Sequence, residues 1–245
     1  GGIDLKKFYE KNELGFAIAW IVLYCMVMAP IRGSCGDDSP VMLAGLTLFA
    51  AGLLVFIRSA RLEKKYGLVK WRGSAREYLY FLPILVLTAG NLWGGVGMAY
   101  DGTAQLFAVL SMFLVGIVEE LIFRGLLFRA LLDQNAPPVA ITISAATFGI
   151  GHIVNLLTGR GGLETFVQVL FAIAWGFLFT LVFYHSGSLL VCIFVHGMVD
   201  VFSKFAAGVS RSDYTYVIVT ILVSIAYCLY LSRKPAALAP EKAGK

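Results

Sequence analysis

The sequence predicts an all-α membrane protein, a polytopic bundle of about eight transmembrane helices that encloses an intramembrane cavity. Of its 245 residues, 59% are hydrophobic and 14% are charged, and the mean hydropathy is +0.80. A soluble domain averages about 45–50% apolar and about 25% charged residues. Apolar runs of about 20 residues, the length that crosses a bilayer as a helix, recur along most of the chain. The alternating segments of an outer-membrane barrel do not occur, so a helical bundle is expected.

These apolar runs define eight expected spans, with ends placed to within a few residues. The spans cover residues 14–31, 41–57, 78–98, 104–131, 139–157, 163–184, 188–207 and 214–232. We expect one domain in three parts. Residues 1–103 hold the first three spans and a basic loop at 58–77, residues 104–207 form the core, and residues 208–245 hold the last span and a basic tail.

The distribution of basic residues predicts the orientation of the chain. Lysine and arginine gather before the first span, in loop 58–77 and in the tail, which share one side if the spans number eight. The opposite loops hold few basic residues, among them Arg32 and Arg160. The positive-inside rule then places both termini in the cytoplasm. Topology accounts for the net charge of +5, so we expect an integral plasma membrane protein with no nucleic-acid partner. A bacterial origin is expected because the chain is short.

Several features are expected to serve topology or packing only. Loop 58–77 is expected to be solvated, with an amphipathic helix on the membrane surface as the alternative. Gly94 and Gly95 are expected to kink the third span or to allow close packing there. Lys204 is expected to reach the lipid headgroups. The cysteines form no C-x-x-C pair and are expected to be packing residues: Cys25, Cys35, Cys192 and Cys228.

Two carboxylates and a guanidinium stand inside the fourth expected span, as Glu119, Glu120 and Arg124. Each charge near the centre of a bilayer costs about 2.5–3.5 kcal/mol, so partners or a water-filled cavity are required. Glu120 and Arg124 are four residues apart and share a helix face, which favours an ion pair. Glu119 points about 100° away and is therefore the candidate general base. A structural ion pair that locks two helices is the alternative.

Two other spans carry histidines. His152 follows Phe148 in the fifth span among small residues, and His196 and Asp200 share one face of the seventh span. Taken alone, His152 is typical of a hydrogen-bonded core histidine, and Asp200 can serve only to orient His196. Helix rise places Glu119 and both histidines between the midplane and the cytoplasmic side. Because independent structural pairs need not share one layer, this convergence predicts a catalytic or metal site.

These ordered motifs resemble those of the CPBP family, which comprises the CAAX prenyl protease 2 type and Abi-like, bacteriocin-processing intramembrane endopeptidases. The E-E-x-x-x-R motif is matched by Glu119, Glu120 and Arg124, F-x-x-x-H by Phe148 and His152, and H-x-x-x-N/D by His196 and Asp200. The resemblance covers about residues 104–207. It implies hydrolysis of a peptide bond within the membrane. Glu119 would activate the water, and His152 would assist.

The resemblance leaves two roles open for His196 and Asp200, namely oxyanion stabilisation and metal binding. Here the last position is Asp rather than Asn. An ionised aspartate cannot donate a hydrogen bond to an oxyanion, but it is a good zinc ligand beside two histidines. We therefore expect zinc or another divalent metal on His152, His196 and Asp200, with a water that Glu119 deprotonates. A metal-free glutamate mechanism is the alternative.

The expected function is that of an intramembrane metalloprotease acting on a membrane-associated peptide or a lipidated protein tail. Its expected site residues are Glu119, Glu120, His152, His196 and Asp200, supported by Arg124 and Phe148. Family members are associated with bacteriocin self-immunity, so a non-catalytic immunity or signalling protein that binds a peptide or a sensor protein is the alternative. A proton-coupled transporter is less favoured because no broken-helix repeat is visible.

Overall fold

The computed structural model describes residues 5–154, 161–207 and 211–239, with side chains of the last segment from residue 214. These residues form helices and, outside them, an isolated bridge between Val96 and Ala206, which confirms the all-α class. The helices are α1 (Leu5–Lys11), α2 (Glu13–Cys35), α3 (Pro40–Ser59), η1 (Ala75–Phe81), α4 (Leu82–Thr88), η2 (Gly90–Leu92), α5 (Gly102–Glu120), η3 (Leu121–Phe128), α6 (Arg129–Leu132), α7 (Pro137–Gly151), α8 (Gly162–Ser186), α9 (Leu189–Ser203) and α10 (Arg211–Leu231).

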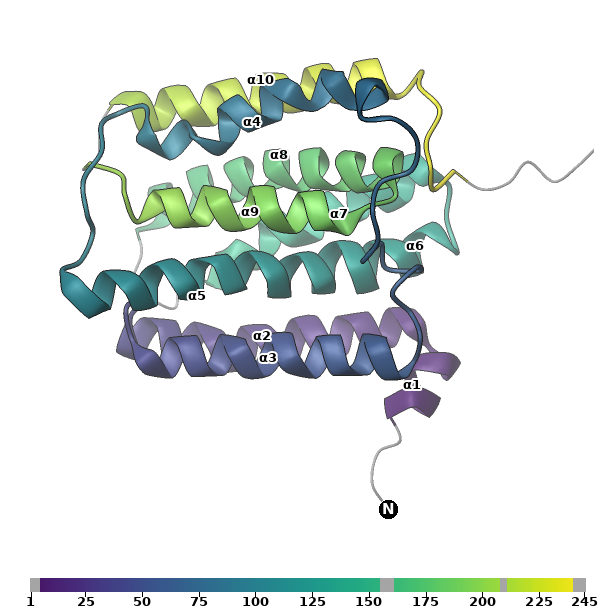
Figure 1. Cartoon of the computed structure of the whole chain (residues 1–245), viewed down its shortest axis with the longest axis horizontal. Helices are drawn as coiled ribbons and strands as arrows, with labels where there is room; N and C mark the ends of the chain where they lie inside the picture. Colours follow the sequence, from purple (N-terminus) through teal and green to yellow (C-terminus); the bar gives the residue numbers. More distant parts are fainter. Residues whose placement is uncertain (1–4, 155–160, 208–210, 240–245) are drawn as a thin grey trace, which may run out of the picture.

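The long helices run side by side in layers (Figure 1). The continuous helix from α5 to α6 packs between the α2–α3 pair on one side and α9 on the other. Helix α8 contacts α7 and α10. Within the described residues, six helical segments are long and apolar enough to cross a membrane, and they correspond to six of the predicted spans. Residues 155–157 of the fifth predicted span, and Arg160, lie outside the described part of the chain.

The remaining two predicted spans differ from expectation. Residues 78–98 do not form one α-helix but 3₁₀-helix η1, the short helix α4, 3₁₀-helix η2 and an irregular stretch. Pro83 near the start of α4 lacks an amide proton, which interrupts the α-helical hydrogen bonds. A 3₁₀-helix rises about 2.0 Å per residue, so this short segment still runs the length of α10 (Figure 1). Helix α9 ends at Ser203 with 15 residues rather than at 207.

The fourth predicted span is continuous over Gly102–Leu132, but its middle is not an ordinary α-helix. Residues Leu121–Phe128 form a π-helix, which begins directly after Glu120 and contains Arg124. π-Helical segments are rare and are frequent at functional sites. The wider turn rotates the following residues relative to a regular helix, and nothing in the residue pattern indicated it.

Glycines bring α5 and α9 into close contact. A Cβ atom on Gly116 would lie 2.5 Å from the backbone nitrogen of Gly197, a distance at which the two backbones would have to separate. Gly116 is one helical turn before Glu120, and Gly197 follows His196. The contact therefore sets how near the carboxylates of α5 stand to the imidazole of α9.

The basic segments share one end of the bundle. Lys65 in the loop after α3 pairs with Glu13 at 2.5 Å and Asp133 at 3.2 Å, and these carboxylates hold the pKa of Lys65 above its usual value although its partial burial acts the other way. Arg72 in the same loop donates to the carbonyl of Ala237 in the tail at 3.1 Å. The expectation that these segments lie on one side is thus confirmed.

The 60–74 stretch is a loop, as expected, and not the alternative amphipathic helix. It is less solvated than predicted, since Tyr66 is 1% exposed. Its backbone also binds the start of α9, where the Leu189 amide donates to the Gly67 carbonyl at 2.8 Å. The loop therefore anchors the helix that carries His196.

Candidate active site

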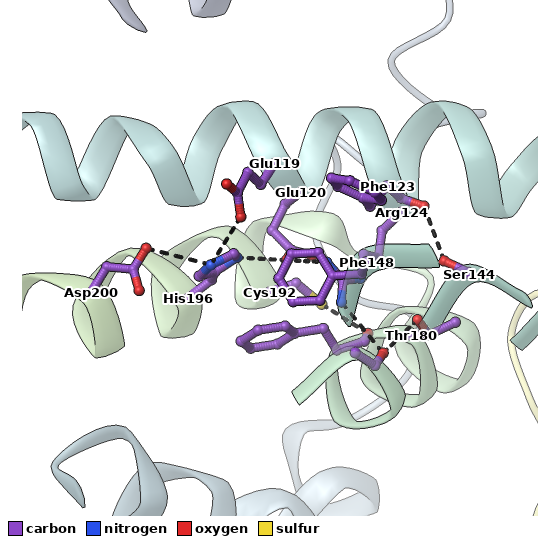
Figure 2. Close-up of polar contacts among 12 residues, drawn as sticks. Glu119, Glu120, Phe123, Arg124, Ser144, Phe148, Thr180, Cys192, His196 and Asp200 are labelled. Carbon is purple, nitrogen blue, oxygen red and sulfur yellow. Dashed lines mark hydrogen bonds and ion pairs between the residues drawn. The ribbon is translucent and has the colours of Figure 1, made fainter. Parts of the chain in front are cut away.

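A chain of buried charges links α5, η3 and α9 (Figure 2). Arg124 Nη1 donates to Glu120 Oε1 at 2.9 Å, and His196 Nδ1 lies 2.8 Å from the same oxygen. Glu120 and Arg124 are both 0% exposed. The predicted ion pair between Glu120 and Arg124 is confirmed. Since an ionised carboxylate only accepts hydrogen bonds, Nδ1 of His196 carries the proton that Glu120 receives.

Aromatic rings fix the two cationic members of this chain. The guanidinium of Arg124 lies over the ring of Phe148 at 4.1 Å and that of Phe179 at 5.2 Å. The imidazole of His196 stacks on Phe179 at 5.0 Å and meets the edge of Phe148 at 5.6 Å. Phe148 therefore supports both side chains, in agreement with its expected structural role.

Glu119 has different surroundings from its neighbour. Its Oε2 lies 3.7 Å from His196 Nε2, and its Oε1 accepts a hydrogen bond from the hydroxyl of Tyr24 on α2 at 3.1 Å. Glu119 also lines a cavity of about 60 Å³, which has room for a few water molecules. The carboxylate of Glu120 is thus buried within the protein, whereas that of Glu119 faces the cavity.

His152 lines the same cavity. It caps the end of α7, and its Nδ1 lies 3.1 Å from the carbonyl of Phe148. His152 and Glu119 therefore face one space, as their predicted convergence requires. The depth of His152 relative to the cytoplasmic side stays a prediction.

Helix α2 supplies cavity residues that the sequence motifs did not indicate. Tyr24, Met28 and Arg32 follow one another at four-residue spacing, so they share a helix face. They form part of the cavity wall, whose residues are Tyr24, Cys25, Met28, Ala29, Arg32, Met42, Glu119, Phe123, Phe148, Gly151, His152 and Val154. An available signal was the polar pair on one face of an apolar helix, but Arg32 was assigned to a loop.

Asp200 contacts the far side of His196. Its Oδ2 lies 3.5 Å from Nε2 of His196, one helical turn earlier on α9. Because Nε2 faces the carboxylates of both Asp200 and Glu119, the arrangement is favourable when one proton is shared among the three groups. Asp200 thus orients His196.

The predicted metal ligands do not form a preformed donor set. Nδ1 of His196 is bonded to Glu120 and Nδ1 of His152 to a backbone carbonyl, which leaves the Nε2 atom of each ring as the nitrogen that could bind a metal. No group of three or more His, Cys, Asp or Glu side chains in the described chain is placed to hold a metal ion. Whether the protein binds zinc stays a prediction.

A second, apolar pocket of about 220 Å³ lies on the other face of this site. Phe179, Cys192 and Val195 form its inner wall, so it is separated from His196 by the ring of Phe179. Its outer wall comes from the η1–α4 segment, with residues Trp71, Ala75, Tyr78, Phe81, Leu82, Ile84 and Leu85. The broken third span therefore forms part of the wall.

The buried pair predicts a specific stability pattern. Arg124→Met leaves Glu120 without its cation and should destabilise the protein by about 3–5 kcal/mol. Adding Glu120→Gln, which keeps an acceptor for His196, should recover much of that loss. Arg129→Met is the control because its pair with Asp133 at 3.9 Å is partly exposed, so its loss should stay below about 1 kcal/mol. Unfolding in detergent, followed by circular dichroism, measures all three. Equal losses for Arg124→Met and Arg129→Met would contradict the assignment.

The comparison with protein families gives one match. The model for the Rce1-like family, described as type II CAAX prenyl endopeptidase Rce1-like, matches residues 102–202. No significant match was found among curated proteins or solved structures. The matched region contains all three motifs that the resemblance rested on and runs from the start of α5 to α9. Over residues 102–202, from α5 to α9, the chain is therefore similar to the Rce1-like family.

Proposed function

We propose that the protein is an intramembrane endopeptidase in which Glu119 activates a water molecule to hydrolyse a peptide bond. The observation that carries this proposal is the separation of the two adjacent carboxylates. Glu120 is fully buried between Arg124 and His196, whereas Glu119 lines a cavity together with His152. The family match over residues 102–202 supports a protease.

The chemistry follows from these positions. Glu119 takes a proton from a water in the cavity, and the resulting hydroxide attacks the scissile carbonyl. Tyr24 and His196 hold the Glu119 carboxylate from its two oxygens. His152 at the cavity wall assists in its doubly protonated form. Its Nδ1 donates to the Phe148 carbonyl, and the proton on Nε2 is donated to the substrate carbonyl oxygen as negative charge develops there. Glu119 then returns the proton to the leaving amine. Glu120 and Arg124 act as positioning residues.

The apolar pocket beside Phe179 supports a lipidated substrate. Its lining is almost entirely hydrocarbon and aromatic, which suits an isoprenoid or acyl chain rather than a polar peptide. The matched family is named for prenyl substrates. We propose that the substrate is a membrane-associated peptide or a lipidated protein tail.

The alternative, a non-catalytic immunity or signalling protein, would use the same cavity for binding. Binding alone does not require the two carboxylates to have different surroundings, and no contact in the described structure favours this alternative. The two functions differ in whether the bound peptide is cleaved.

The proposed activity is tested with purified protein and a fluorescent prenylated peptide that ends in cysteine, two aliphatic residues and one further residue. Glu119→Gln should lower kcat by about 10²–10⁴-fold because general-base catalysis is lost, with an unchanged melting temperature. Glu120→Gln is the control at the adjacent carboxylate. It should lower the melting temperature, because it removes the charge that pairs with buried Arg124. A parallel assay with a metal chelator tests the zinc prediction. Undiminished cleavage by Glu119→Gln would exclude its role, and loss only in Glu120→Gln would reverse the two assignments.

The charges at the two ends of the helix bundle support an orientation with both chain termini in the cytoplasm. Basic residues crowd the end that holds α1, the 60–74 loop and the start of the tail. At the other end, Arg32 and Lys204 both pair with Asp37. By the positive-inside rule the first end is cytoplasmic. The cavity, which reaches Arg32 and Val154, would then extend toward the extracytoplasmic side. A bacterial origin stays a prediction.

This orientation is tested with Cys35, which is exposed at the end of α2. A membrane-impermeant maleimide should label it in intact cells of a bacterial host, without opening of the inner membrane. Cys35→Ser should remove the label, since Cys192 is buried and Cys25 and Cys228 are only partly accessible. Labelling that requires a permeabilised inner membrane would reverse the orientation.

A further inference from the structure

The irregular stretch between η2 and α5 pairs with the residues that follow α9, at the end of the bundle remote from the N-terminus (Figure 1). Val96 and Ala206 form an isolated antiparallel bridge. Two hydrogen bonds frame it, Gly97 N–H to the Phe205 carbonyl at 2.8 Å and Ala207 N–H to the Gly95 carbonyl at 3.1 Å. Because the ladder bonds belong to the neighbouring residues, Val96 and Ala206 are a non-hydrogen-bonded pair.

The backbone of Val96 therefore faces away from this pairing. In an antiparallel ladder, the N–H and C=O groups of a residue in a non-hydrogen-bonded pair point to the opposite edge of the strand. Neither group of Val96 has a hydrogen-bond partner among the described residues, and the same holds for Met98, two positions further on. The two residues are 72% and 62% exposed. A further strand can thus be added at this edge, which we call the 96–98 edge.

Gly95 turns the chain from η2 into this short strand. Its φ of +121° lies in the region that residues with a side chain rarely adopt. A Cβ atom at this position would also lie only 3.3 Å from that of Ala207 in the paired segment. The glycine is therefore needed both for the turn and for the close approach of the two segments, and it fixes the direction in which the 96–98 edge faces.

The 96–98 edge is connected to the outer end of the cavity by three successive contacts. The Ala99 amide donates to the Lys204 carbonyl at 3.1 Å. Lys204 Nζ lies 2.6 Å from Asp37 Oδ2, and Asp37 Oδ1 accepts a hydrogen bond at 2.7 Å from Arg32, which lines the cavity. A peptide that extends beyond the cavity at Arg32 therefore has this edge within its reach.

The chemistry of the edge selects a peptide rather than a lipid chain. Unpaired amide and carbonyl groups bind another backbone, largely independently of its side chains. Hydrocarbon cannot satisfy them, and each unsatisfied group costs several kcal/mol in the bilayer core. Asp101, Asp37 and Lys204 mark this end of the bundle as polar. In a protein tail, the part that precedes the cleaved bond is the part long enough to leave the cavity.

We propose that the substrate segment preceding the cleaved bond adds as an antiparallel strand to the 96–98 edge. Val96 forms reciprocal hydrogen bonds with one peptide residue, and Met98 with the residue two positions away. This inference rests on the proposed function and names how the substrate is held outside the cavity. Because the bonds are made to the backbone, the edge holds substrates of differing sequence. Val96 and Met98 are binding residues that do not touch the reacting atoms.

The inference is tested with the fluorescent prenylated peptide, extended before its cysteine by enough residues to reach the edge. Each peptide N–H in the extension is replaced in turn by an ester oxygen, which removes one donor and keeps the shape. Binding to Glu119→Gln, which should not turn the peptide over, is followed by fluorescence anisotropy. Two positions separated by one residue should each show a Kd raised by about 2–10-fold, the range of one net hydrogen bond. The residue between them should show no change.

A matched pair of variants assigns these losses to the edge. Val96→Pro in the Glu119→Gln protein removes the donor N–H, so Kd should rise, and the ester at the paired peptide position should then have no additional effect. Val96→Thr keeps the N–H at nearly the same size and should bind as the parent does. Melting temperatures show whether each variant is folded. If Val96→Pro does not fold, the ester series alone decides.

The outcomes separate this inference from the proposed function. Ester effects that are absent, or equal at successive positions, would overturn the inference while cleavage by the wild type leaves the peptidase proposal intact. Alternating effects without cleavage by the wild type would overturn only the peptidase proposal. A disulfide between two Met98→Cys molecules would show that the edge pairs with a second copy of the chain instead, and would also overturn the inference.

Discussion

The site depends on the hydrogen-bonded ion pair between Arg124 and Glu120, which is fully buried. Two such charges in a membrane are costly unless they neutralise each other. Their pairing allows the spare lone pair of Glu120 Oε1 to hold Nδ1 of His196. The close approach of Gly116 to Gly197 brings the two helices near enough for that bond. The imidazole is thereby locked, with Nε2 directed toward Glu119.

With Glu120 occupied, its neighbour is free for chemistry. Glu119 keeps one oxygen on Tyr24 and the other toward His196, and its carboxylate lines the cavity. The cavity has a negative end at Glu119 and a positive end at the cluster of Arg32, Asp37 and Lys204. The contact of Tyr24 with Glu119 and the cluster around Arg32 both depend on α2, which lies outside the matched family region.

The class of fold and the Glu120–Arg124 pair could be predicted because hydropathy and four-residue spacing are local properties of the chain. The interruption of the third predicted span was not predicted, because its apolar composition is that of a transmembrane helix. Pro83 interrupts the α-helical hydrogen bonds there. The π-helix after Glu120 left no trace in the residue pattern. Tyr24 and Arg32 were missed because their contacts with Glu119 and Met112 are nonlocal. The metal site was predicted from residue types; the described side chains are not gathered around one point as a set of three ligands, and metal binding stays a prediction.

The central claim is that Glu119 activates a water and does not itself attack the substrate. A single turnover in water enriched in ¹⁸O, with the protein in excess over the prenylated peptide, tests it most directly. Mass spectrometry of the new C-terminal carboxyl group should find one ¹⁸O atom, because the attacking oxygen comes from solvent. Unlabelled product in the first turnover would show that a carboxylate of the protein supplied the oxygen through a covalent intermediate, and would contradict the account.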